Sequence, residues 1–383
     1  MTGFGPEHLP YGVFRRAGES PRVGVRLGDG VIDLAELAAD GPLDADPALF
    51  DQSTLNAFMA AGPATWARVR EQLRSLTAGP DAELATVALD DIELLLPIAI
   101  GDYVDFYSSL DHATNVGRLF RPGADPLVPN WRHMPIGYHG RAGTVVVSGT
   151  PIRRPSGQRR EPGDDAPVFG PSARLELELE LGFVVGVPSA QGVAVSAALD
   201  HVFGVLLVND WSARDIQAWE YRPLGPFLAK SFATSVAAWV TPLDAVLDRR
   251  VTAPAQEPAP LAYLREDPWA LDLDLEVELN GTVIARTSAR HLYWSAAQQL
   301  AHLTVNGASL RVGDLFASGT ISGPEREQRG SLLELAWNGA EPIELADGSA
   351  RSFLLDGDEV VLRGGGGDAL ALGEVRGRIE PGA

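Results

Sequence analysis

Short apolar runs separated by glycine and proline set the pattern of the chain from Leu94 onward. The runs are rich in valine, leucine and aromatic residues, which is typical of strands. The clearest examples are Thr144–Ser148, Leu175–Val187, Phe203–Asn209, Leu271–Leu279 and Glu359–Leu362. Few long helical patterns interrupt them, so we expect a mainly β (α+β) fold of the sandwich or roll type rather than alternating strands and helices.

The preceding residues have a different pattern and predict a small separate domain. Tyr11–Arg15, Val23–Arg26 and Val31–Asp33 are expected strands, the last two joined by a turn at Gly28–Gly30. A helical stretch follows at Leu55–Leu76. Because 383 residues exceed what one ordinary core spans, we divide the chain into a domain of residues 1–95 and a domain of residues 96–383.

Composition restricts the expected compartment and partners. The first residues show no apolar signal core, and no apolar run is long enough to cross a bilayer. There is no cysteine, which removes disulfides, thiolate metal sites and a cysteine nucleophile. The formal net charge is −20, so nucleic acid and anionic membranes are poor partners. We therefore expect a cytoplasmic protein that binds neither nucleic acid nor membranes.

One basic residue differs in kind from the other basic residues. Of the 31 arginines and lysines, only Lys230 is a lysine. Codon bias in a GC-rich genome explains the arginines but not this ammonium group, which fits where a planar guanidinium cannot. Lys230 is therefore a candidate site residue. No phosphate loop, GxSxG or HExxH motif occurs, which disfavours nucleotide enzymes, serine hydrolases and zinc peptidases.

An acidic strand has the sequence RLELELEL at residues 174–181. Side chains alternate along a strand, so Glu176, Glu178 and Glu180 share one face. By itself this pattern fits the solvated face of an amphipathic strand. Alternatively, a hard cation such as Mg²⁺ or Ca²⁺ bridges two of the carboxylates. The apolar continuation at 183–185 favours the cation because it carries the strand into a core.

A second group of candidates lies in DYVDFYSSLDHATNVG at residues 102–117. A helix that starts at Asp105 would place Asp105, Ser109 and His112 on one face. The carboxylate and the imidazole would then lie about 10 Å apart along the axis, which suits a metal ligand and a general base on opposite sides of a substrate. An N-capping aspartate and an ordinary histidine are the commoner alternative.

A third group lies where the expected strand 203–209 ends. If a helix begins at once, its face carries a stripe of mixed polar groups made by Asp210, Arg214, Gln217 and Tyr221. A capped helix with an Asp–Arg pair is the simpler alternative, although so mixed a stripe at a strand end favours a site. The loop WRHMPIGYHGR at residues 131–141 either wraps a ligand or packs structurally.

Together these segments are similar to the fumarylacetoacetase family. The matching stretches are DYVDFYSSLDHATNVG, PNWRHMPIGYHGRAGTVVVSGTPIRRP, ELELGFVVG, VNDWSARDIQAWEYRPLGPFLAKSF, YWSAAQQLAHLTVNGASLRVGDLFASGTISGPE, GSLLELAWNG and LDGDEV, with FGPEHLPYGVFRR near the start. They cover nearly the whole chain, and patterns of this length are very specific. The resemblance implies a small SH3-like N-terminal β-barrel, then a larger β-roll/sandwich catalytic domain of the fumarylacetoacetase type, and a homodimer.

The resemblance also implies a set of site residues. It places a divalent cation, Mg²⁺ or Ca²⁺, on Asp105, Glu178, Glu180 and Asp210. A further Mg²⁺ position involves Asp210, Lys230 and Thr234. Substrate contacts carry over to Tyr107, Arg121, Tyr138, Gln217, Tyr221 and Thr320. The catalytic roles carry over to the base His112, to the carboxylate Glu334 that orients it, and to the oxyanion-stabilising group Arg214, Gln217 and Lys230.

Two positions depart from the family pattern. Ala229 and Ala233 stand where the pattern has glycine on either side of Lys230. A methyl group strains the backbone wherever φ must be positive. The geometry of the loop from Lys230 to Thr234 therefore depends on the backbone angles at these two alanines.

The activity implied by the resemblance is cleavage of a carbon–carbon bond. The expected reaction is the hydrolysis of 4-fumarylacetoacetate, a small diketo acid, to fumarate and acetoacetate, the last step of tyrosine and phenylalanine catabolism. It would use a metal-bound diketone and water activated by His112. The alternatives are a hydrolase, isomerase or decarboxylase of the same superfamily acting on acylpyruvates or related 1,3-dicarbonyl acids, and a catalytically silent metal-binding module.

Overall fold

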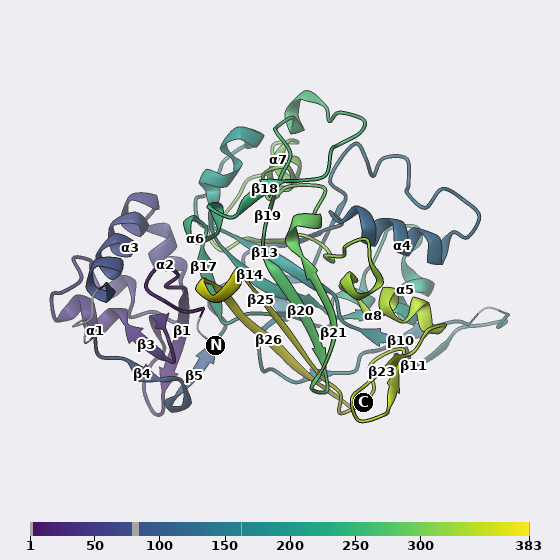
Figure 1. Cartoon of the computed structure of the whole chain (residues 1–383), viewed down its shortest axis with the longest axis horizontal. Coiled ribbons are helices and arrows are strands. Elements are labelled where there is room, and N and C mark those ends of the chain that lie inside the picture. Colours follow the sequence, from purple (N-terminus) through teal and green to yellow (C-terminus); the bar gives the residue numbers. More distant parts are fainter. Residues whose placement is uncertain (1–2, 79–83, 162, 383) are drawn as a thin grey trace.

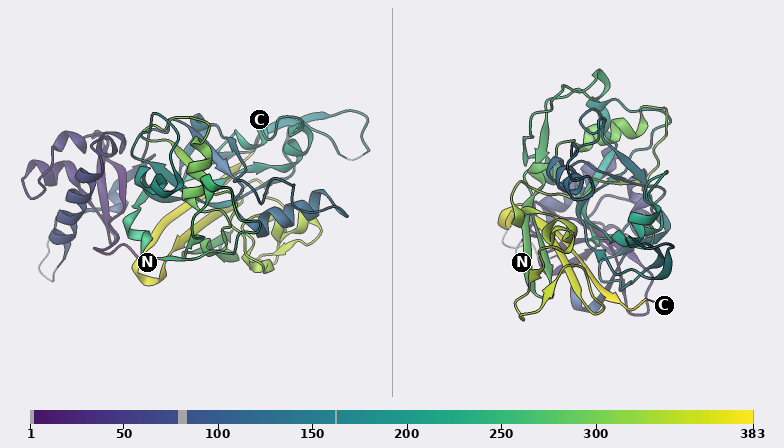
Figure 2. Two further views of the ribbon diagram at one scale, coloured as in Figure 1. Left: turned by 90° about the horizontal axis from the view of Figure 1, so that it is seen from above. Right: turned by 90° about the vertical axis from the view of Figure 1, so that its right-hand side faces the viewer.

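A computed structural model describes residues 3–78, 84–161 and 163–382. A smaller N-terminal unit lies at one end of the long axis, and the β10–β11 hairpin lies at the other (Figures 1 and 2). The N-terminal unit contains strands β1 (Tyr11–Arg16), β2 (Arg22–Leu27), β3 (Gly30–Asp33), β4 (Val87–Ala88) and β5 (Ile92–Leu95), and helices α1 (Leu34–Ala39), α2 (Asn56–Ala60) and α3 (Pro63–Thr77). The fold is mainly β with two domains, as the sequence predicts.

A large sheet runs through both units in the order β4-β3-β2-β1-β17-β14-β13-β22-β6-β7, with β5, β8 and β16 attached off this path. Its C-terminal strands are β6 (Tyr103–Phe106), β7 (Gly137–His139), β8 (Val145–Val147), β13 (Leu179–Val185), β14 (Val202–Asp210), β16 (Thr234–Val236), β17 (Trp239–Pro242) and β22 (Leu315–Ala317). Every residue of β13 and β14 is buried, because both strands are near-continuous apolar runs. These two strands form the centre of the core.

A second sheet packs beside the first in the order β21-β20-β25-β26-β9. It consists of β9 (Ile152–Arg153), β20 (Asp274–Leu279), β21 (Thr282–Ser288), β25 (Glu359–Gly365) and β26 (Ala371–Glu380). Short pairs complete the β structure: β10 (Ser156–Arg159) with β11 (Val168–Pro171), β12 (Leu175–Glu176) with β15 (Ser212–Ala213), β18 (Arg250–Thr252) with β19 (Trp269–Leu271), and β23 (Ile343–Glu344) with β24 (Ala350–Arg351).

The helices of the C-terminal unit are short. They are α4 (Leu110–Phe120), α5 (Arg214–Glu220), α6 (Asp244–Leu247), α7 (Ala296–Thr304) and α8 (Leu332–Leu335). Helix α4 begins after Ser109, whose side chain accepts a hydrogen bond from the His112 backbone N–H. Among the described residues, no helix combines the length and the apolar character needed to cross a membrane.

Several element boundaries differ from the sequence predictions. The predicted helix 55–76 is two helices, since Gly62 has a φ of 84° and Pro63 starts a new helix. The predicted strand 175–187 divides into β12 and β13, and the predicted strand 271–279 divides into β19 and β20. Glu178 lies between β12 and β13 in an isolated bridge with Ser331.

The two helical stripes predicted at the site are wrong in their first member. Asp105 lies on β6 and Asp210 is the last residue of β14, so neither belongs to the helix that follows it. The short strand β15 also separates Asp210 from α5. The physical reason is pairing between distant segments: β6 pairs with β22, and the end of β14 pairs with β16.

The N-terminal unit joins the C-terminal unit by continuous strand pairing. Strand β1 pairs with β17, with Tyr11 opposite Val240 and Gly12 opposite Trp239. The other strand pairings of this unit leave its sheet open rather than closed into a barrel among the described residues. At the same junction, the buried His8 ring contacts the Gly3 carbonyl at 2.8 Å and the Thr241 hydroxyl at 2.9 Å.

Candidate active site

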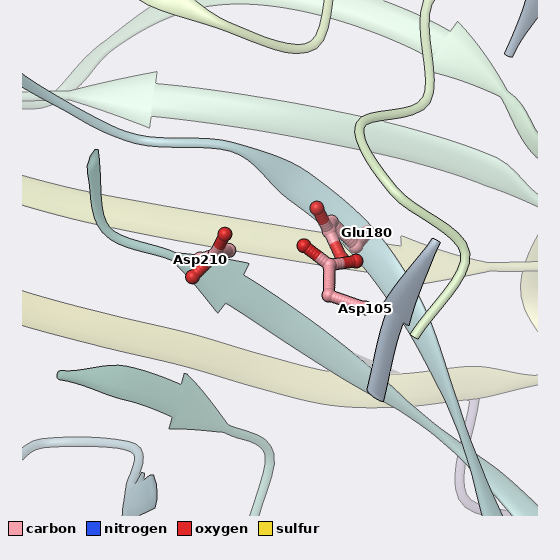
Figure 3. Close-up of side chains that lie close together, drawn as sticks. All are labelled: Asp105, Glu180 and Asp210. Atoms are coloured by element: carbon pink, nitrogen blue, oxygen red, sulfur yellow. The ribbon is translucent and has the colours of Figure 1, made fainter. Parts of the chain in front are cut away.

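Three buried carboxylates meet where β6, β13 and β14 lie close together in the large sheet. Asp105, Glu180 and Asp210 each offer an oxygen, and these oxygens all lie within 4.8 Å of one another. Asp105 and Glu180 lie side by side, while Asp210 lies at the end of its strand (Figure 3). Between β13 and β6 runs β22, whose small Ala317 is the register partner of Asp105. The sheet therefore brings together three residues that are far apart in the sequence.

Half of the oxygens in this group lack a partner. Asp105 Oδ1 and both carboxylate oxygens of Glu180 are buried and accept no hydrogen bond from the described residues. Burial raises the pKa of Glu180 well above its usual range, and the neighbouring Asp105 and Asp210 raise it further. The pKa of Asp105 is raised in the same way, by burial first and by Asp210 second. Hard cations such as Mg²⁺ and Ca²⁺ prefer oxygen ligands of this kind, so the donor set fits a divalent metal ion.

Glu178, the remaining expected metal ligand, has a different environment. Its carboxylate accepts hydrogen bonds from Lys230 Nζ and Arg214 Nη2, and from the Ser212 hydroxyl at 3.1 Å. Burial disfavours its charged form, but the adjacent Arg214 and Lys230 outweigh burial and hold the pKa of Glu178 below its usual range. Glu178 is therefore an ionised carboxylate that already has protein partners, unlike Glu180 two residues further on.

Lys230 connects Glu178 to the carboxylate group. Its ammonium lies 2.5 Å from Asp210 Oδ2 as well as against Glu178. Asp210 also accepts from the Tyr138 hydroxyl at 2.8 Å and, at 3.4 Å, from the Thr234 hydroxyl. Burial opposes the charge on Lys230, but the two acidic neighbours raise its pKa. The chain's single lysine thus lies inside the candidate site, in contact with two of the expected metal ligands.

His112 and Glu334 form a buried pair next to this cluster. His112 Nδ1 lies 2.6 Å from Glu334 Oε2, and His112 Nε2 lies 3.6 Å from Glu178 Oε1. Burial disfavours the Glu334 charge, yet His112 and the hydrogen bonds to the carboxylate lower its pKa. An ionised carboxylate only accepts hydrogen bonds, so Nδ1 carries the proton. The lone pair of Nε2 then faces the carboxylate cluster and is able to accept a proton.

Three further residues hold the Glu334 carboxylate in place and were missed by the sequence analysis. Asn115 Nδ2 donates to Oε1 at 2.9 Å, while the hydroxyls of Ser322 and Ser331 donate to Oε2 at 2.8 Å each. Ser331 also caps α8 by accepting from the Glu334 N–H. A signal for Ser331 was readable, since Ser-x-x-Glu before apolar residues is a capping pattern. The Ser322 contact depends on the tertiary fold.

Arg214 and Gln217 share the first part of α5. Arg214 donates from Nη1 to Gln217 Oε1 at 2.8 Å, which leaves the Gln217 amide NH₂ as a donor toward its surroundings. The remaining two nitrogens of Arg214 contact Glu176 and Glu178. Tyr221, the last member of the predicted stripe, is the C-cap of α5 and is 39% exposed. The stripe is thus confirmed for its helical members, with Tyr221 at its solvent side.

The expected substrate contacts Tyr107, Arg121 and Thr320 lie around the His112 pair and the β6–β22 strands. The Tyr107 ring packs edge-on against His112, with ring centroids 5.2 Å apart. Burial raises the pKa of Tyr107, the charge of Glu334 raises it further, and the charge of Arg214 opposes that rise. Arg121 donates to the Pro126 carbonyl, whereas Thr320 Oγ1 is buried and has no partner among the described residues.

The two alanines near Lys230 do not strain the backbone. The non-glycine residues with positive φ in the described part of the chain are Leu9, Asn280, Trp337 and Asn338. Ala229 and Ala233 are buried and are not among them. The replacement of glycine at these positions is therefore compatible with the Lys230 loop. The Ala229 N–H donates to Glu220 Oε1 at 2.8 Å, which helps to fix that loop.

Comparison with known families covers both units of the chain. Residues 103–380 match the model described as the C-terminal domain of fumarylacetoacetate (FAA) hydrolase, and residues 7–99 match the fumarylacetoacetase N-terminal domain. The chain belongs to the fumarylacetoacetate hydrolase family. Curated fumarylacetoacetases of this family are similar over nearly their full length. The chain is 47% identical to those of Rattus norvegicus and Homo sapiens and 48% identical to that of Caenorhabditis elegans, over 99% of this chain and 97% of each relative.

Solved structures agree on the fold. A fumarylacetoacetate hydrolase from Exiguobacterium antarcticum gives a TM-score of 0.58 at 17% identity, covering 97% of this chain and 99% of that chain. A maleylpyruvate hydrolase from Sphingobium sp. SYK-6, solved with manganese(II) and pyruvate, gives a TM-score of 0.57 at 17% identity, covering 98% of this chain and 100% of that chain. At this level of identity the likeness concerns the architecture of the family.

Proposed function

We propose that this protein hydrolyses the carbon–carbon bond of 4-fumarylacetoacetate to give fumarate and acetoacetate, the last step of tyrosine and phenylalanine catabolism. The observation that carries the proposal is the His112–Glu334 pair beside the buried carboxylate group. Near full-length similarity to curated fumarylacetoacetases supports the choice of substrate. A hydrolase needs a base, a place for negative charge and a bound substrate, and the proposal assigns residues to each.

The metal ligands in this proposal are Asp105, Glu178, Glu180 and Asp210, with Lys230 and Thr234 at a further Mg²⁺ position. The unpartnered oxygens of Asp105 and Glu180 support a hard cation, Mg²⁺ or Ca²⁺. When bound, such a cation supplies Lewis-acid polarisation of the diketone oxygens. Lys230 neutralises part of the acidic cluster, so that an anionic substrate meets less repulsion there.

His112 is the proposed general base. Glu334 holds its Nδ1–H, which fixes the ring and leaves Nε2 to take a proton from water. The resulting hydroxide adds to the carbonyl carbon on the fumaroyl side. Negative charge then develops on the carbonyl oxygen and is stabilised by Arg214, Gln217 and Lys230. Asn115, Ser322 and Ser331 keep Glu334 ionised and oriented during this step.

Bond cleavage completes the reaction. The carbonyl of the fumaroyl part re-forms, and the electron pair of the broken carbon–carbon bond stays with the acetoacetate carbon. The proton taken by His112 Nε2 is available to that carbon, so one water is consumed and the products are fumarate and acetoacetate. The proposed substrate contacts that position the two ends of the diketo acid are Tyr107, Arg121, Tyr138, Gln217, Tyr221 and Thr320. Arg121 would pair with a substrate carboxylate.

Broader features of the protein complete the proposal. The catalytic domain comprises residues 96–383 and the N-terminal domain comprises residues 1–95, a division close to the gap between the two family matches. The protein acts as a homodimer in the cytoplasm on a small-molecule substrate, without nucleic acid or membrane partners. The net charge of −20 supports the last point.

The test is the loss of fumarylacetoacetate absorbance with purified protein, first with Mg²⁺ or Ca²⁺ and then with a chelator. We expect loss of absorbance that the chelator stops. Acylpyruvates serve as comparison substrates, because related enzymes of the same superfamily act on other dicarbonyl acids. Turnover of acylpyruvates without turnover of fumarylacetoacetate would overturn the proposed substrate, and no turnover of either with metal present would favour a silent metal-binding module.

A further inference from the structure

We propose that Glu176 is a positioning residue that fixes Arg214 relative to the His112–Glu334 pair. The inference rests on the proposed function, because it concerns the same reaction. Glu176 belongs to the acidic face of the strand, but the resemblance to the family assigns it no role in the site. It is completely buried, so a solvated surface carboxylate does not describe it.

Both oxygens of Glu176 are occupied by donors from different parts of the chain. Oε1 accepts from Arg214 Nε on α5, and Oε2 accepts from the Leu333 backbone N–H on α8 at 2.6 Å. Leu333 lies in the first turn of α8, where the backbone N–H has no partner within its own helix. The Glu176 carboxylate therefore spans the gap between the helix that carries the guanidinium and the helix that carries Glu334.

These contacts complete a ring of neighbouring groups around the site. From Glu176 the ring passes through Arg214 to Glu178, whose Oε1 lies 3.6 Å from the unprotonated His112 Nε2 without a hydrogen bond between them. It continues from His112 to Glu334 at 2.6 Å and returns through α8 and the Leu333 N–H to Glu176. Apart from Glu176, each member of this ring is a group that the proposed mechanism uses or the helix that carries such a group. Removing Glu176 would break the connection between Arg214 and α8, the helix whose Glu334 holds the base His112.

A carboxylate is the side chain that this position requires. Two donors approach it, and an ionised carboxylate accepts on both oxygens. The amide of glutamine has the same shape but one oxygen, so its NH₂ group would face either Arg214 Nε–H or the Leu333 N–H. Aspartate keeps the charge but is one methylene shorter, so its carboxylate lies further from the two donors. Each substitution should loosen one end of the bridge.

The experiment compares Glu176→Gln with a matched control, Asp358→Asn. Asp358 is also buried and also accepts from an arginine and a backbone N–H, namely Arg351 at 2.9 Å and Leu355 at 2.8 Å. It lies at the start of the β25–β26 hairpin, in the second sheet. Loss of a buried acceptor should lower Tm in both variants, so only an effect on turnover separates positioning from stability.

We expect Glu176→Gln to lower kcat by about 10²-fold, since a misplacement of about 1 Å at a reacting group has that effect. KM should change by no more than about threefold, because substrate affinity does not depend on the exact alignment of base and guanidinium. Asp358→Asn should keep the wild-type kcat. Glu176→Asp, which retains the charge, should also lose kcat and covers the case in which the glutamine variant fails to fold. Wild-type kcat in either folded variant would overturn the proposal.

A double-mutant cycle with Arg214→Lys tests whether Glu176 acts through the guanidinium. If the bridge needs both ends, Glu176→Gln should cause little further loss of kcat in the Arg214→Lys background. Losses that multiply in full would overturn the positioning role. The wild-type protein is assayed in parallel with fumarylacetoacetate and Mg²⁺. Absence of wild-type turnover would contradict the proposed function, whereas wild-type turnover with unchanged Glu176 variants contradicts only this inference.

Discussion

The candidate site contains two groups of buried carboxylates that differ in their hydrogen-bond partners and in the direction of their pKa shifts. Glu178 accepts from two cations and a hydroxyl, Glu334 accepts from an imidazole, an amide and two hydroxyls, and both have lowered pKa values. Asp105 and Glu180 face each other, have unpartnered oxygens and have raised pKa values. Glu178 and Glu180, one from each group, are only two residues apart in the sequence. The difference indicates that one group is neutralised by the protein, while the other is built to be neutralised by something that binds.

The largest expected effect concerns the first group, in which the chain itself supplies the partners, and it involves His112, the partner of Glu334. His112→Ala should lower kcat by about 10⁴-fold, because it removes the group that takes the proton from water. Its metal affinity, measured by calorimetry with Mg²⁺, should stay at the wild-type value, since His112 is not among the proposed ligands. His302→Ala is the control, because His302 contacts Tyr263 in another part of the fold. Normal turnover by His112→Ala would contradict the assigned base.

Glu178→Gln should show how much the stability of the protein depends on the partners of Glu178, which belongs to the same group. The substitution leaves two buried cations, Lys230 and Arg214, without their shared carboxylate. Breaking one partner out of a buried ion pair lowers stability by about 4 kcal/mol. Chemical denaturation of the metal-free protein measures the change. A stability equal to that of the wild type would show that these cations do not depend on Glu178.

Glu180→Gln should have the opposite sign, although it changes the same residue type only two positions away. Its oxygens have no donors in the described structure and its pKa is raised, so the carboxyl must take up a proton when the metal-free protein folds. The amide avoids this cost and should stabilise the metal-free protein by about 3 kcal/mol at pH 7. Mg²⁺ should raise the Tm of the wild type and leave the variant unchanged, because a protein that binds ligand only when folded is stabilised by it. A variant that is destabilised without metal and still binds Mg²⁺ would break the comparison.

The smallest expected effect concerns His8, a buried histidine that stays neutral instead of gaining a charged partner. Burial lowers the pKa of His8 to about 4, below the value of about 6.5 in an unfolded chain. As the pH falls, the unfolded state therefore takes up a proton before the folded state does. The free energy of unfolding is not reduced by His8 above pH 6.5, and it falls as the pH drops from 6.5 toward 4. The loss should be about 2 kcal/mol at pH 5 relative to pH 7.5.

The measurement is the pH dependence of unfolding free energy in the wild type and in His8→Gln. The variant should lack the part of the slope that lies between pH 6.5 and 4. His139→Gln is the control, because the His139 side chain is 76% exposed and should leave the slope unchanged. Equal slopes in the wild type and His8→Gln would contradict the lowered pKa of His8 in the folded protein.

Local patterns in the sequence predicted part of this arrangement. Alternation along RLELELEL placed three glutamates on one face, and the apolar residues after them correctly indicated that the strand enters a core. The singular lysine pointed to a site, and Lys230 indeed lies against Asp210 and Glu178. These inferences succeeded because each depends on residues that are neighbours along the chain.

Other features depend on pairing between distant segments, and there the sequence misled. Asp105 was predicted on a helix, but Tyr103–Phe106 pairs with β22 and Ser109 supplies the helix cap instead. Asp210 was predicted to begin a helix, but its partner across the sheet is Thr234. The bridge from Glu176 to the Leu333 N–H joins residues 157 positions apart, and no local pattern announces it. Periodicity identifies faces, whereas register between remote strands decides which faces meet.

The strand pairing between the two units has a consequence for how the protein can be divided. Because β1 is the neighbour of β17, a chain shortened to its larger unit would leave the backbone groups of that strand without partners along one side. An exposed strand edge of this kind is a template for pairing with other molecules. The apolar residues Trp239 and Val240 lie on that edge and are now covered. By pairing with this edge, the smaller unit prevents it from pairing with other molecules.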